Sequence, residues 1–393
     1  MNICILNHRE NNPYIGGVEN ISYTLGHLWK EKGYSVIFLS LHKSNIQKKY
    51  HSDCEEYFLP NDDVYSAENN KFVTEIFNKH QIAIIINQAN VFPEVCELAQ
   101  IIRQKFPVKL ITTIHYAPFF ELAGIENNFF LPSKKGIKNR ILSLLLFIRF
   151  YCYKKRALIT QEAKNLQKIA LDSDFIVCLS EKYIPIFRKL IANPNCNTKL
   201  LAIPNTVKIT QKTQYSKKKK QVLYVGRLEY GLKRVDRILE IWKNIEYEFK
   251  DWNLCIVGDG NAANSLKELA KSYGLKNVSF EGFRDPHIYF AESSIFCLTS
   301  SSEGFGIVLV EALMEKCVPI AYNSFLSATD IIENGVNGIL IKPFKKNMFV
   351  AELKKLMANT IERERLAQNN RITLKKFEAR QVLKQWDNLF SKL

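Results

Sequence analysis

The sequence predicts an α/β protein built from two doubly wound domains with mainly parallel sheets. Strand-like apolar runs alternate with helix-like segments along the whole chain, which is the pattern of consecutive βαβ units. At 393 residues the chain is too long for one ordinary hydrophobic core, so two domains are expected. A polar stretch near the middle of the chain separates the two halves.

The first half contains six strand-like runs: Ile3–Asn7, Ser35–Ser40, Ile82–Asn87, Lys109–His115, Phe175–Ser180 and Lys199–Ile203. A helix is expected from about Val18 to Lys32, between the first two of them. Residues 43–70 are polar and show no strong period, so they are expected to form an irregular connection.

The domain boundary is predicted at Pro204-Asn205, where a polar stretch begins that ends in Lys217–Lys220. The four lysines are interpreted as a solvated linker rather than as a nucleic-acid site. The N-terminal domain is therefore expected to span 1–205 and the C-terminal domain 206–374.

The second half contains six further strand-like runs: Gln221–Val225, Asn253–Val257, Val278–Glu281, Ile295–Thr299, Val318–Ala321 and Gly338–Ile341. The tail from about Ile361 onward is predicted to be helical. Its apolar residues recur at helical spacing, and the last helix is expected at about 375–393.

The composition is that of a soluble globular protein, with 47% hydrophobic and 24% charged residues. No apolar run reaches the ~20 residues that cross a bilayer. The first residues, Met1–Leu6, lack the basic and apolar regions of a secretory signal. A cytoplasmic protein is expected.

The net charge of +16 favours anionic partners. Basic residues gather between Lys134 and Arg156, a stretch without acidic residues, on both sides of the apolar run Ile141–Ile148. This composition favours a helix lying on an anionic membrane leaflet, with the protein peripheral on the inner face of the cell membrane. The alternative is a core helix with solvated basic ends. Nucleic acid is not expected as a partner, because the aromatic residues of this block lie in an apolar core.

The most informative motif follows the strand-like run Ile295–Leu298. A turn rich in serine and glycine comes next, and then an amphipathic helix, with Glu303 in the turn and Glu311 in the helix. The glycines allow close approach to a bound group, and the N-terminus of the helix suits a phosphate. Carboxylates beside a phosphate site are placed to accept hydrogen bonds from hydroxyls. A ligand with both phosphates and many hydroxyls is a nucleotide sugar.

Two glutamates eight residues apart around Gly-Phe-Gly resemble the C-terminal motif of the retaining glycosyltransferases of the GT-B fold, in particular family 4. Three further segments resemble motifs of that family, in the order in which the family has them: Gly16-Gly17-Val18-Glu19, Val225-Gly226-Arg227-Leu228 with Lys233, and Val257-Gly258-Asp259-Gly260. The resemblance implies two Rossmann-like domains that face each other across a cleft, with the donor bound by the second domain and the last helix crossing back onto the first.

The resemblance also implies roles for single residues. Arg227 and Lys233 would grip the diphosphate of the donor, with Arg234 as the runner-up for Lys233. Glu311 would hold the ribose, and Glu303 would face hydroxyls of the transferred sugar. The remaining donor-binding residues are expected to be Gly16, Gly17, Gly226, Gly258, Gly304, Phe305, Gly306 and Ile307.

His115 ends an apolar run and resembles the family histidine that contacts the donor sugar or the acceptor. It completes the expected catalytic set, together with Glu303, Arg227 and Lys233. No side chain has the features of a covalent nucleophile, which agrees with the front-face route proposed for retaining enzymes of this fold.

Neither a metal nor a cofactor is expected. Asp172-Ser173-Asp174 matches the letters of a metal-binding Asp-x-Asp, but it precedes a buried strand in the half that would not hold the donor. The nucleotide sugar, UDP- or GDP-linked, would be a substrate.

The sequence thus predicts a retaining, metal-independent glycosyltransferase acting on a surface polysaccharide or a lipid-linked glycan precursor, such as one for lipopolysaccharide or capsule. One alternative is a soluble transferase that makes a storage glucan or a disaccharide. Another is a non-catalytic partner subunit of the same fold, which the intact set of charged motif residues disfavours. An NAD-dependent oxidoreductase is disfavoured because no G-x-G-x-x-G follows the first strand.

Overall fold

The computed structural model describes residues 1–44, 50–123, 137–192, 199–207 and 218–393, with the side chains of 137–152 outside the description. The chain divides into two compact units. Unit 1 comprises Met1–Tyr116, Glu162–Lys208 and Phe377–Leu393, and unit 2 comprises Ala117–Gln161 and Ile209–Lys376. The sequence-based domains differ from these units in placing 117–161 with the N-terminal part of the chain.

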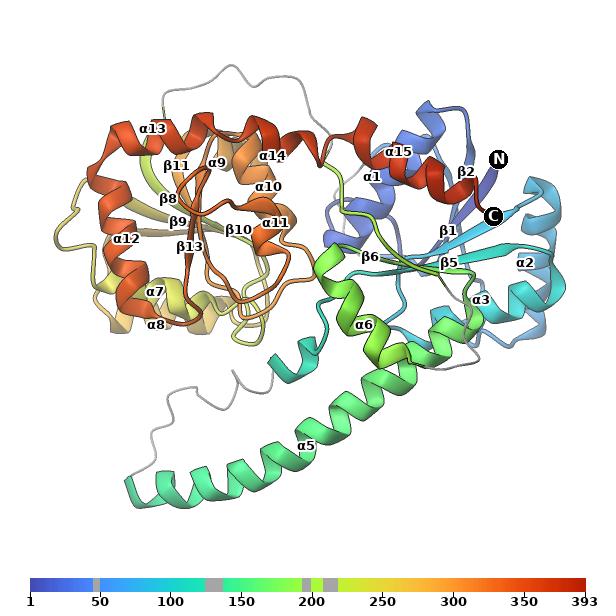
Figure 1. Ribbon diagram of the computed structural model, residues 1–393, viewed down its shortest axis with the longest axis horizontal. Helices are drawn as coiled ribbons and strands as arrows, with labels where there is room; N and C mark the ends of the chain where they lie inside the picture. The colour runs from blue at the N-terminus through green and yellow to red at the C-terminus, as the bar shows by residue number, and fades with distance from the viewer. Residues whose placement is uncertain (45–49, 124–136, 193–198, 208–217) are drawn as a thin grey trace. The chain divides into compact units, whose positions relative to one another are not determined.

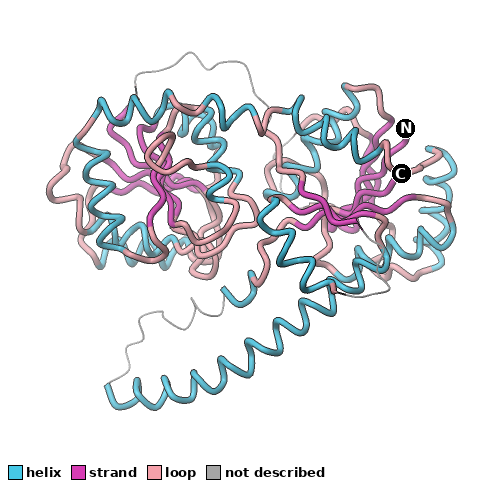
Figure 2. Tube along the Cα trace, in the orientation of Figure 1, coloured by secondary structure: helices cyan, strands magenta, loops and turns pink. Residues whose placement is uncertain are grey.

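In each unit, helices cover both faces of a parallel sheet (Figures 1 and 2). The predicted fold class, two Rossmann-like α/β domains, is therefore confirmed. The predicted strands are found within one to two residues of their expected ends.

Within the described residues of unit 1, seven strands form a parallel sheet in the order β3-β2-β1-β4-β5-β6-β7. The strands are β1 Asn2–Arg9, β2 Ser35–His42, β3 Glu55–Phe58, β4 Ile84–Asn87, β5 Lys109–Ile114, β6 Phe175–Cys178 and β7 Lys199–Ala202. The α-helices that lie wholly or partly in this unit are α1 Gly17–Glu31, α2 Ala67–His80, α3 Pro93–Lys105, α5 Ile137–Asp172, α6 Ile184–Ile191 and α15 Ala379–Phe390.

The inner strands of unit 1 are apolar on both faces, because helices cover both sides of a parallel sheet. Cys4 and Leu6 belong to a core that includes Val73 of α2 and Leu98 of α3. Alternate residues of β1 point to the opposite face, where Ile5 approaches Gly26 of α1.

The C-terminal helix α15 packs on α1 within unit 1. The ring of Trp386 meets that of Trp29 edge-on, with centroids 5.2 Å apart, and Phe390 lies 5.6 Å from Trp29. The Tyr34 hydroxyl donates to Asp387 at 3.0 Å. Just before the helix, the Thr206 hydroxyl donates to the carbonyl of Phe377 at 2.9 Å, so the returning chain is tied to unit 1 before α15 begins.

Within the described residues of unit 2, six strands form a parallel sheet in the order β10-β9-β8-β11-β12-β13. The strands are β8 Lys219–Val225, β9 Asn253–Val257, β10 Val278–Gly282, β11 Ser293–Leu298, β12 Val318–Tyr322 and β13 Ile339–Ile341. The other helices of this unit are α7 Val235–Lys243, α8 Ala263–Ser272, α9 Pro286–Glu292, α10 Ile307–Met314, α11 Ala328–Ile331, α12 Lys346–Ala358, α13 Thr360–Gln368 and α14 Arg371–Lys375.

Two local predictions were wrong. Residues 43–70 are not wholly irregular, because β3 and the start of α2 lie among them. The lysines before β8 are not a linker in the described part, because Lys219 and Lys220 belong to β8, where their side chains are exposed. Lys218 is partly buried, and its ammonium donates to the carbonyls of Phe290 at 2.9 Å and Glu315 at 2.6 Å. Burial lowers the pKa of Lys218.

The basic block around 134–156 is only partly described. Helix α5 runs through most of it, from Ile137 onward. Lys134 and Lys135 lie outside the described residues, as do the side chains up to position 152. The predicted contact of this block with a membrane therefore stays a prediction. In the described parts of the chain, no helix combines the length and the apolarity needed to cross a bilayer.

Candidate functional site

The candidate site of unit 2 lies where two neighbouring strands end. β8 and β11 are adjacent and parallel, so their carboxyl ends meet at the same edge of the sheet. The segment after β8 carries Arg227 and Lys233, and the turn after β11 carries Glu303. Open α/β sheets bind their ligands beyond this edge. The topology therefore gathers residues that are about seventy positions apart in the sequence.

Lys233 and Glu303 form an ion pair at this edge. The lysine Nζ lies 2.7 Å from each carboxylate oxygen of Glu303. The Ser300 hydroxyl donates to Oε1 of the same carboxylate at 2.7 Å. The side chains are 27% and 11% exposed, respectively, so the pair is partly shielded from water and still reachable.

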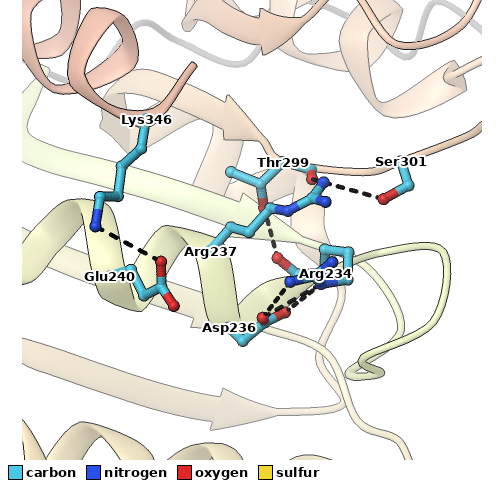
Figure 3. A network of polar contacts seen from close by, with 7 residues as sticks. All are labelled: Arg234, Asp236, Arg237, Glu240, Thr299, Ser301 and Lys346. Atoms are coloured by element: carbon cyan, nitrogen blue, oxygen red, sulfur yellow. Dashed lines mark hydrogen bonds and ion pairs between the residues drawn. The ribbon is translucent and has the colours of Figure 1, made fainter. Parts of the chain in front are cut away.

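Arg234 is the alternative to Lys233 for binding phosphate, but its guanidinium forms an ion pair within its own segment. Its guanidinium is buried and donates to both oxygens of Asp236, with Nε to Oδ1 at 2.9 Å and Nη2 to Oδ2 at 2.8 Å (Figure 3). The residue adopts a left-handed backbone conformation, with φ at +49°, directly before α7. The geometry therefore favours Lys233 over Arg234 as the group available to a phosphate.

Glu311 lies on α10 and is only partly exposed. Its carboxylate makes no hydrogen bond or ion pair with any described residue. Loss of hydration raises its pKa to about 7, and the charge of Asp285 adds to this shift. A carboxylate without a protein partner suits a ligand that offers hydroxyl groups.

The turn before α10 has a backbone that requires glycine at one position. Gly306 caps the helix with φ at +83°, and a Cβ there would lie 3.1 Å from the ring of Phe325. The carbonyl of the preceding residue, buried Phe305, accepts from the Ser327 hydroxyl at 3.1 Å. Helix α10 then begins at Ile307, and the first N–H groups of a helix have no partner inside it. The predicted residues Gly304, Phe305, Gly306 and Ile307 thus line the start of this helix.

Arg227 is exposed, and its guanidinium makes no hydrogen bond or ion pair with the described residues. The glycine before it packs against a second loop. A Cβ at Gly258, where φ is +142°, would lie 1.9 Å from the carbonyl oxygen of Gly226. Close packing of two loops therefore explains why Gly258 must be glycine. The donor contacts of these two glycines stay a prediction.

The other predicted residues belong to unit 1. Gly16 is the residue before α1 and Gly17 is its first residue. His115 follows β5, and its Nε2 is hydrogen-bonded to Oε1 of Gln88. Burial lowers the pKa of His115 to about 4, so this imidazole is neutral near pH 7.

Sequence reasoning missed a group of polar side chains beside His115. Gln88, directly after β4, lies next to Thr113 of β5, because the register of the two strands pairs Asn87 with Thr112. The buried atoms Gln88 Nε2, Asn90 Nδ2 and Thr113 Oγ1 have no hydrogen-bond partner among the described residues. Such unpaired groups are rare in folded proteins and require an explanation. The run Asn87-Gln88-Ala89-Asn90 at a strand end was the available signal.

Glu56 on β3 was also missed, since it falls in the stretch expected to be irregular. Its carboxylate accepts from the backbone N–H of Asn11 at 2.7 Å and from the Tyr50 hydroxyl at 2.9 Å. Asn11, which is fully buried, belongs to the loop that leads from β1 to the glycines at the start of α1. The contacts of Glu56 thus fix the course of that loop.

The Asp-x-Asp match has structural partners. Asp174 accepts from the backbone N–H of Leu110 at 2.9 Å and pairs with Arg103 at 3.0 Å. No three His, Cys, Asp or Glu side chains gather into a metal-holding group in the part of the chain that the structure describes.

Residues 206–373 match the family model of Glycosyl transferases group 1. The chain is 30% identical over 179 residues to the amylovoran biosynthesis glycosyltransferase AmsD of Erwinia amylovora, covering 45% of this chain and 50% of that protein. It is 26% identical over 180 residues to the GalNAc-alpha-(1->4)-GalNAc-alpha-(1->3)-diNAcBac-PP-undecaprenol alpha-1,4-N-acetyl-D-galactosaminyltransferase of Campylobacter jejuni, covering 45% and 49%. The chain thus spans about half the length of these curated relatives.

Among solved structures, the Anabaena protein HepE in complex with UDP-glucose matches all of both chains, with a TM-score of 0.74 and 16% identity. This likeness shows the fold. The comparisons thus relate residues 206–373 to the glycosyl transferases of group 1 and show the GT-B fold.

Proposed function

We propose that this chain is a retaining, metal-independent glycosyltransferase that moves a sugar from a nucleotide-sugar donor to a polysaccharide or lipid-linked glycan precursor. The observation that carries the proposal is the contact of Lys233 with Glu303 at the carboxyl edge of the second sheet, with unpartnered Glu311 on the next helix. A cation and two carboxylates at one sheet edge suit a ligand with both phosphates and hydroxyls.

Arg227 and Lys233 would stabilise the negative charge that develops during the reaction. When the bond between the anomeric carbon and the phosphate oxygen breaks, negative charge collects on the leaving diphosphate. Preorganised cations stabilise that charge. Lys233 forms an ion pair with Glu303. Donor phosphate would draw the ammonium away and leave the carboxylate of Glu303 to accept hydrogen bonds from the transferred sugar.

Glu311 would hold the ribose of the donor. Burial raises the pKa of this carboxylate to about 7, and hydroxyl donors from a ligand would stabilise its charged form. The backbone N–H groups at the start of α10 would bind sugar or phosphate oxygens.

The retaining course needs no protein nucleophile. The leaving phosphate oxygen would accept the proton of the acceptor hydroxyl, while the new glycosidic bond forms on the face from which the diphosphate departs. The protein would contribute positioning and charge stabilisation. His115, neutral near pH 7, would serve as a hydrogen-bonding group to a sugar.

The names of two relatives support the proposed acceptor class. One acts in amylovoran biosynthesis, and the other has an undecaprenol-linked glycan in its name. The basic and apolar composition of 134–156 would place the chain on the inner face of the cell membrane, beside such a lipid.

A donor hydrolysis screen tests the activity. The full chain is incubated with UDP-glucose, UDP-galactose, UDP-N-acetylglucosamine, UDP-N-acetylgalactosamine and GDP-mannose, and release of the nucleoside diphosphate is followed. We expect hydrolysis of at least one donor and its loss in Glu303→Gln. The matched control is Glu268→Gln, which removes the same charge from an exposed ion pair with Lys271 on α8. Absence of hydrolysis with every donor would contradict the proposal.

A vesicle experiment tests the membrane contact. Lys134, Lys135, Lys138 and Arg140 are changed together to Gln, and co-sedimentation with anionic vesicles is measured at low and high salt. Each basic residue near the surface contributes about 1 kcal/mol, screened by salt, so the variant should be released. The control removes the same charge from exposed lysines of unit 2, namely Lys267, Lys271, Lys276 and Lys345. Equal binding of both variants and the wild type would contradict membrane contact through this block.

A further inference from the structure

The turn Thr299–Glu303 is polar and buried, although it follows an apolar strand. Thr299 and Ser300 are fully buried, and Ser301 is 4% exposed. Buried hydroxyl and backbone groups need partners, so a defined set of neighbours must satisfy this turn.

Those neighbours lie on the segment that also carries Lys233. The backbone N–H of Ser301 donates to the carbonyl of Leu232 at 2.7 Å, and the Thr299 hydroxyl donates to the carbonyl of Arg234 at 3.0 Å. Leu232 and Arg234, on either side of Lys233, therefore accept hydrogen bonds from the turn that carries Glu303.

Arg237, in the first turn of α7, adds the side-chain part of this contact. Its Nη1 donates to the carbonyl of Thr299 at 3.3 Å and to the hydroxyl of Ser301 at 3.0 Å (Figure 3). The guanidinium carbon lies 4.0 Å from the centre of the Phe344 ring and 5.9 Å from that of Tyr322. The same flat group thus bonds the turn and stacks on an aromatic ring.

The chemistry of this contact favours arginine. A planar guanidinium donates hydrogen bonds in its plane while its flat face stacks on an aromatic ring, whereas a lysine ammonium is a compact point charge without such a face. Burial and the neighbouring Arg234 lower the pKa of Arg237 to about 10, so the group is still charged near pH 7.

We propose that Arg237 is a positioning residue of the transferase site, which holds the turn Thr299–Glu303 so that the Glu303 carboxylate lies against Lys233. This inference rests on the proposed function. The described contacts of Arg237 join the turn to the ring of Phe344, so its effect on the site passes through Glu303 and Lys233.

The expected defect is in turnover rather than in donor binding. Glu311 and Arg227 lie outside the turn, so the KM for the donor should change less than twofold in Arg237→Met. Misplacing Glu303 should lower kcat, by about tenfold to a hundredfold for a shift of the order of 1 Å.

Arg363 provides a matched control. Its guanidinium lies 5.1 Å from the ring of Trp252 and donates to the carbonyl of Met357 at 2.9 Å, in the same unit. Arg363→Met therefore removes the same kind of stacked, carbonyl-binding arginine away from the turn. Both variants should lower the thermal midpoint, but only Arg237→Met should lower kcat.

The test combines donor hydrolysis with hydrogen–deuterium exchange of the full chain. In Arg237→Met, amide exchange should become faster in the peptide that contains 299–303, and Arg363→Met should leave it unchanged. If Arg237→Met does not fold, Arg237→Lys and Arg363→Lys carry the same comparison. Equal kcat in the paired variants, or unchanged exchange in the turn, would overturn the inference. If the wild type hydrolyses no donor, the proposed function fails, while the exchange measurement still decides whether Arg237 holds the turn.

Discussion

The ammonium of Lys233 is shared equally between the two carboxylate oxygens of Glu303, each 2.7 Å away. A lysine held in this way neutralises a carboxylate that is only 11% exposed. Removing one partner would leave a partly buried charge without its counterion. The two residues are therefore expected to act as one unit in both stability and catalysis.

The first prediction is a double-mutant cycle on this pair. Lys233→Met and Glu303→Gln should each lower the free energy of unfolding, and the loss in the double variant should be smaller than the sum of the single losses, because the pair can be broken only once. Denaturant unfolding of the four proteins measures this. The exposed pair Lys271 and Glu268 is the control, with a coupling energy near zero. Additive effects at Lys233 and Glu303 would contradict the coupling.

The second prediction separates two donor-binding residues by kinetics. Glu311→Ala should mainly raise the KM for the donor, because the ribose is held equally in the ground and transition states. Arg227→Ala should mainly lower kcat, by on the order of 10²–10³, because charge grows on the diphosphate as the bond breaks. Steady-state hydrolysis of the donor found in the screen provides both constants. Turnover at the wild-type level in both variants would remove these residues from the site.

The third prediction concerns pH. Folding raises the pKa of Glu311 from 4.5 to about 7, so the folded chain holds this proton more tightly than the unfolded chain. The ionised group therefore destabilises the fold, and stability is lost as the pH rises from about 4.5 to 7. Glu311→Gln should raise the thermal midpoint at pH 8, by roughly 2–4 °C for each kcal/mol of unfolding free energy that it restores. At pH 4 it should leave the midpoint unchanged. Equal midpoint changes at both values of pH would contradict the raised pKa.

The fourth prediction is that donor hydrolysis survives EDTA. In the proposed reaction, Arg227 and Lys233 stabilise the charge of the leaving diphosphate. A chelator does not remove these side chains. Turnover is compared before and after dialysis against the chelator, and again after Mg²⁺ or Mn²⁺ is added. Complete loss in EDTA with recovery on addition of either metal would contradict the proposed route.

The fifth prediction tests the packing of the C-terminal helix. Trp386 is buried against Trp29, so Trp386→Ala should lower the free energy of unfolding by about 3–5 kcal/mol. Ile372→Ala, in the same tail but at a side chain that is 82% exposed, should change it little. Thermal or denaturant unfolding of the three proteins compares them. Equal stabilities would contradict the packing of α15 on α1.

Most strands could be predicted because the strands of a parallel sheet are buried on both faces and read as continuous apolar runs. The edge strand β3 could not, since it carries Glu55 and Glu56, and Glu56 serves a buried loop through its carboxylate. Lys218 was misread for a related reason. A lysine run normally indicates a solvated segment, yet this ammonium satisfies two carbonyls of unit 2.

The motif residues could be chosen from spacing alone, but their partners could not. Arg237 lies 62 positions from Thr299 in the sequence, and only the adjacency of β8 and β11 brings the two together. The preference for Lys233 over Arg234 likewise required the buried pair of Arg234 with Asp236. The amide nitrogens of Gln88 and Asn90, which have no partner among the described residues, could not be recognised from the sequence because their neighbours come from other strands.

The return of α15 to α1 has a consequence for how the chain is made. Unit 1 receives its covering helix from residues 377–393, which leave the ribosome after all of unit 2. Unit 2 can therefore bury its own sheet during synthesis. Trp29, in contrast, can pack against Trp386 only after more than 350 further residues have been made. Unit 1 is therefore begun first and completed last. Until α15 is made, the apolar face of α1 that carries Trp29 is accessible to chaperones and proteases.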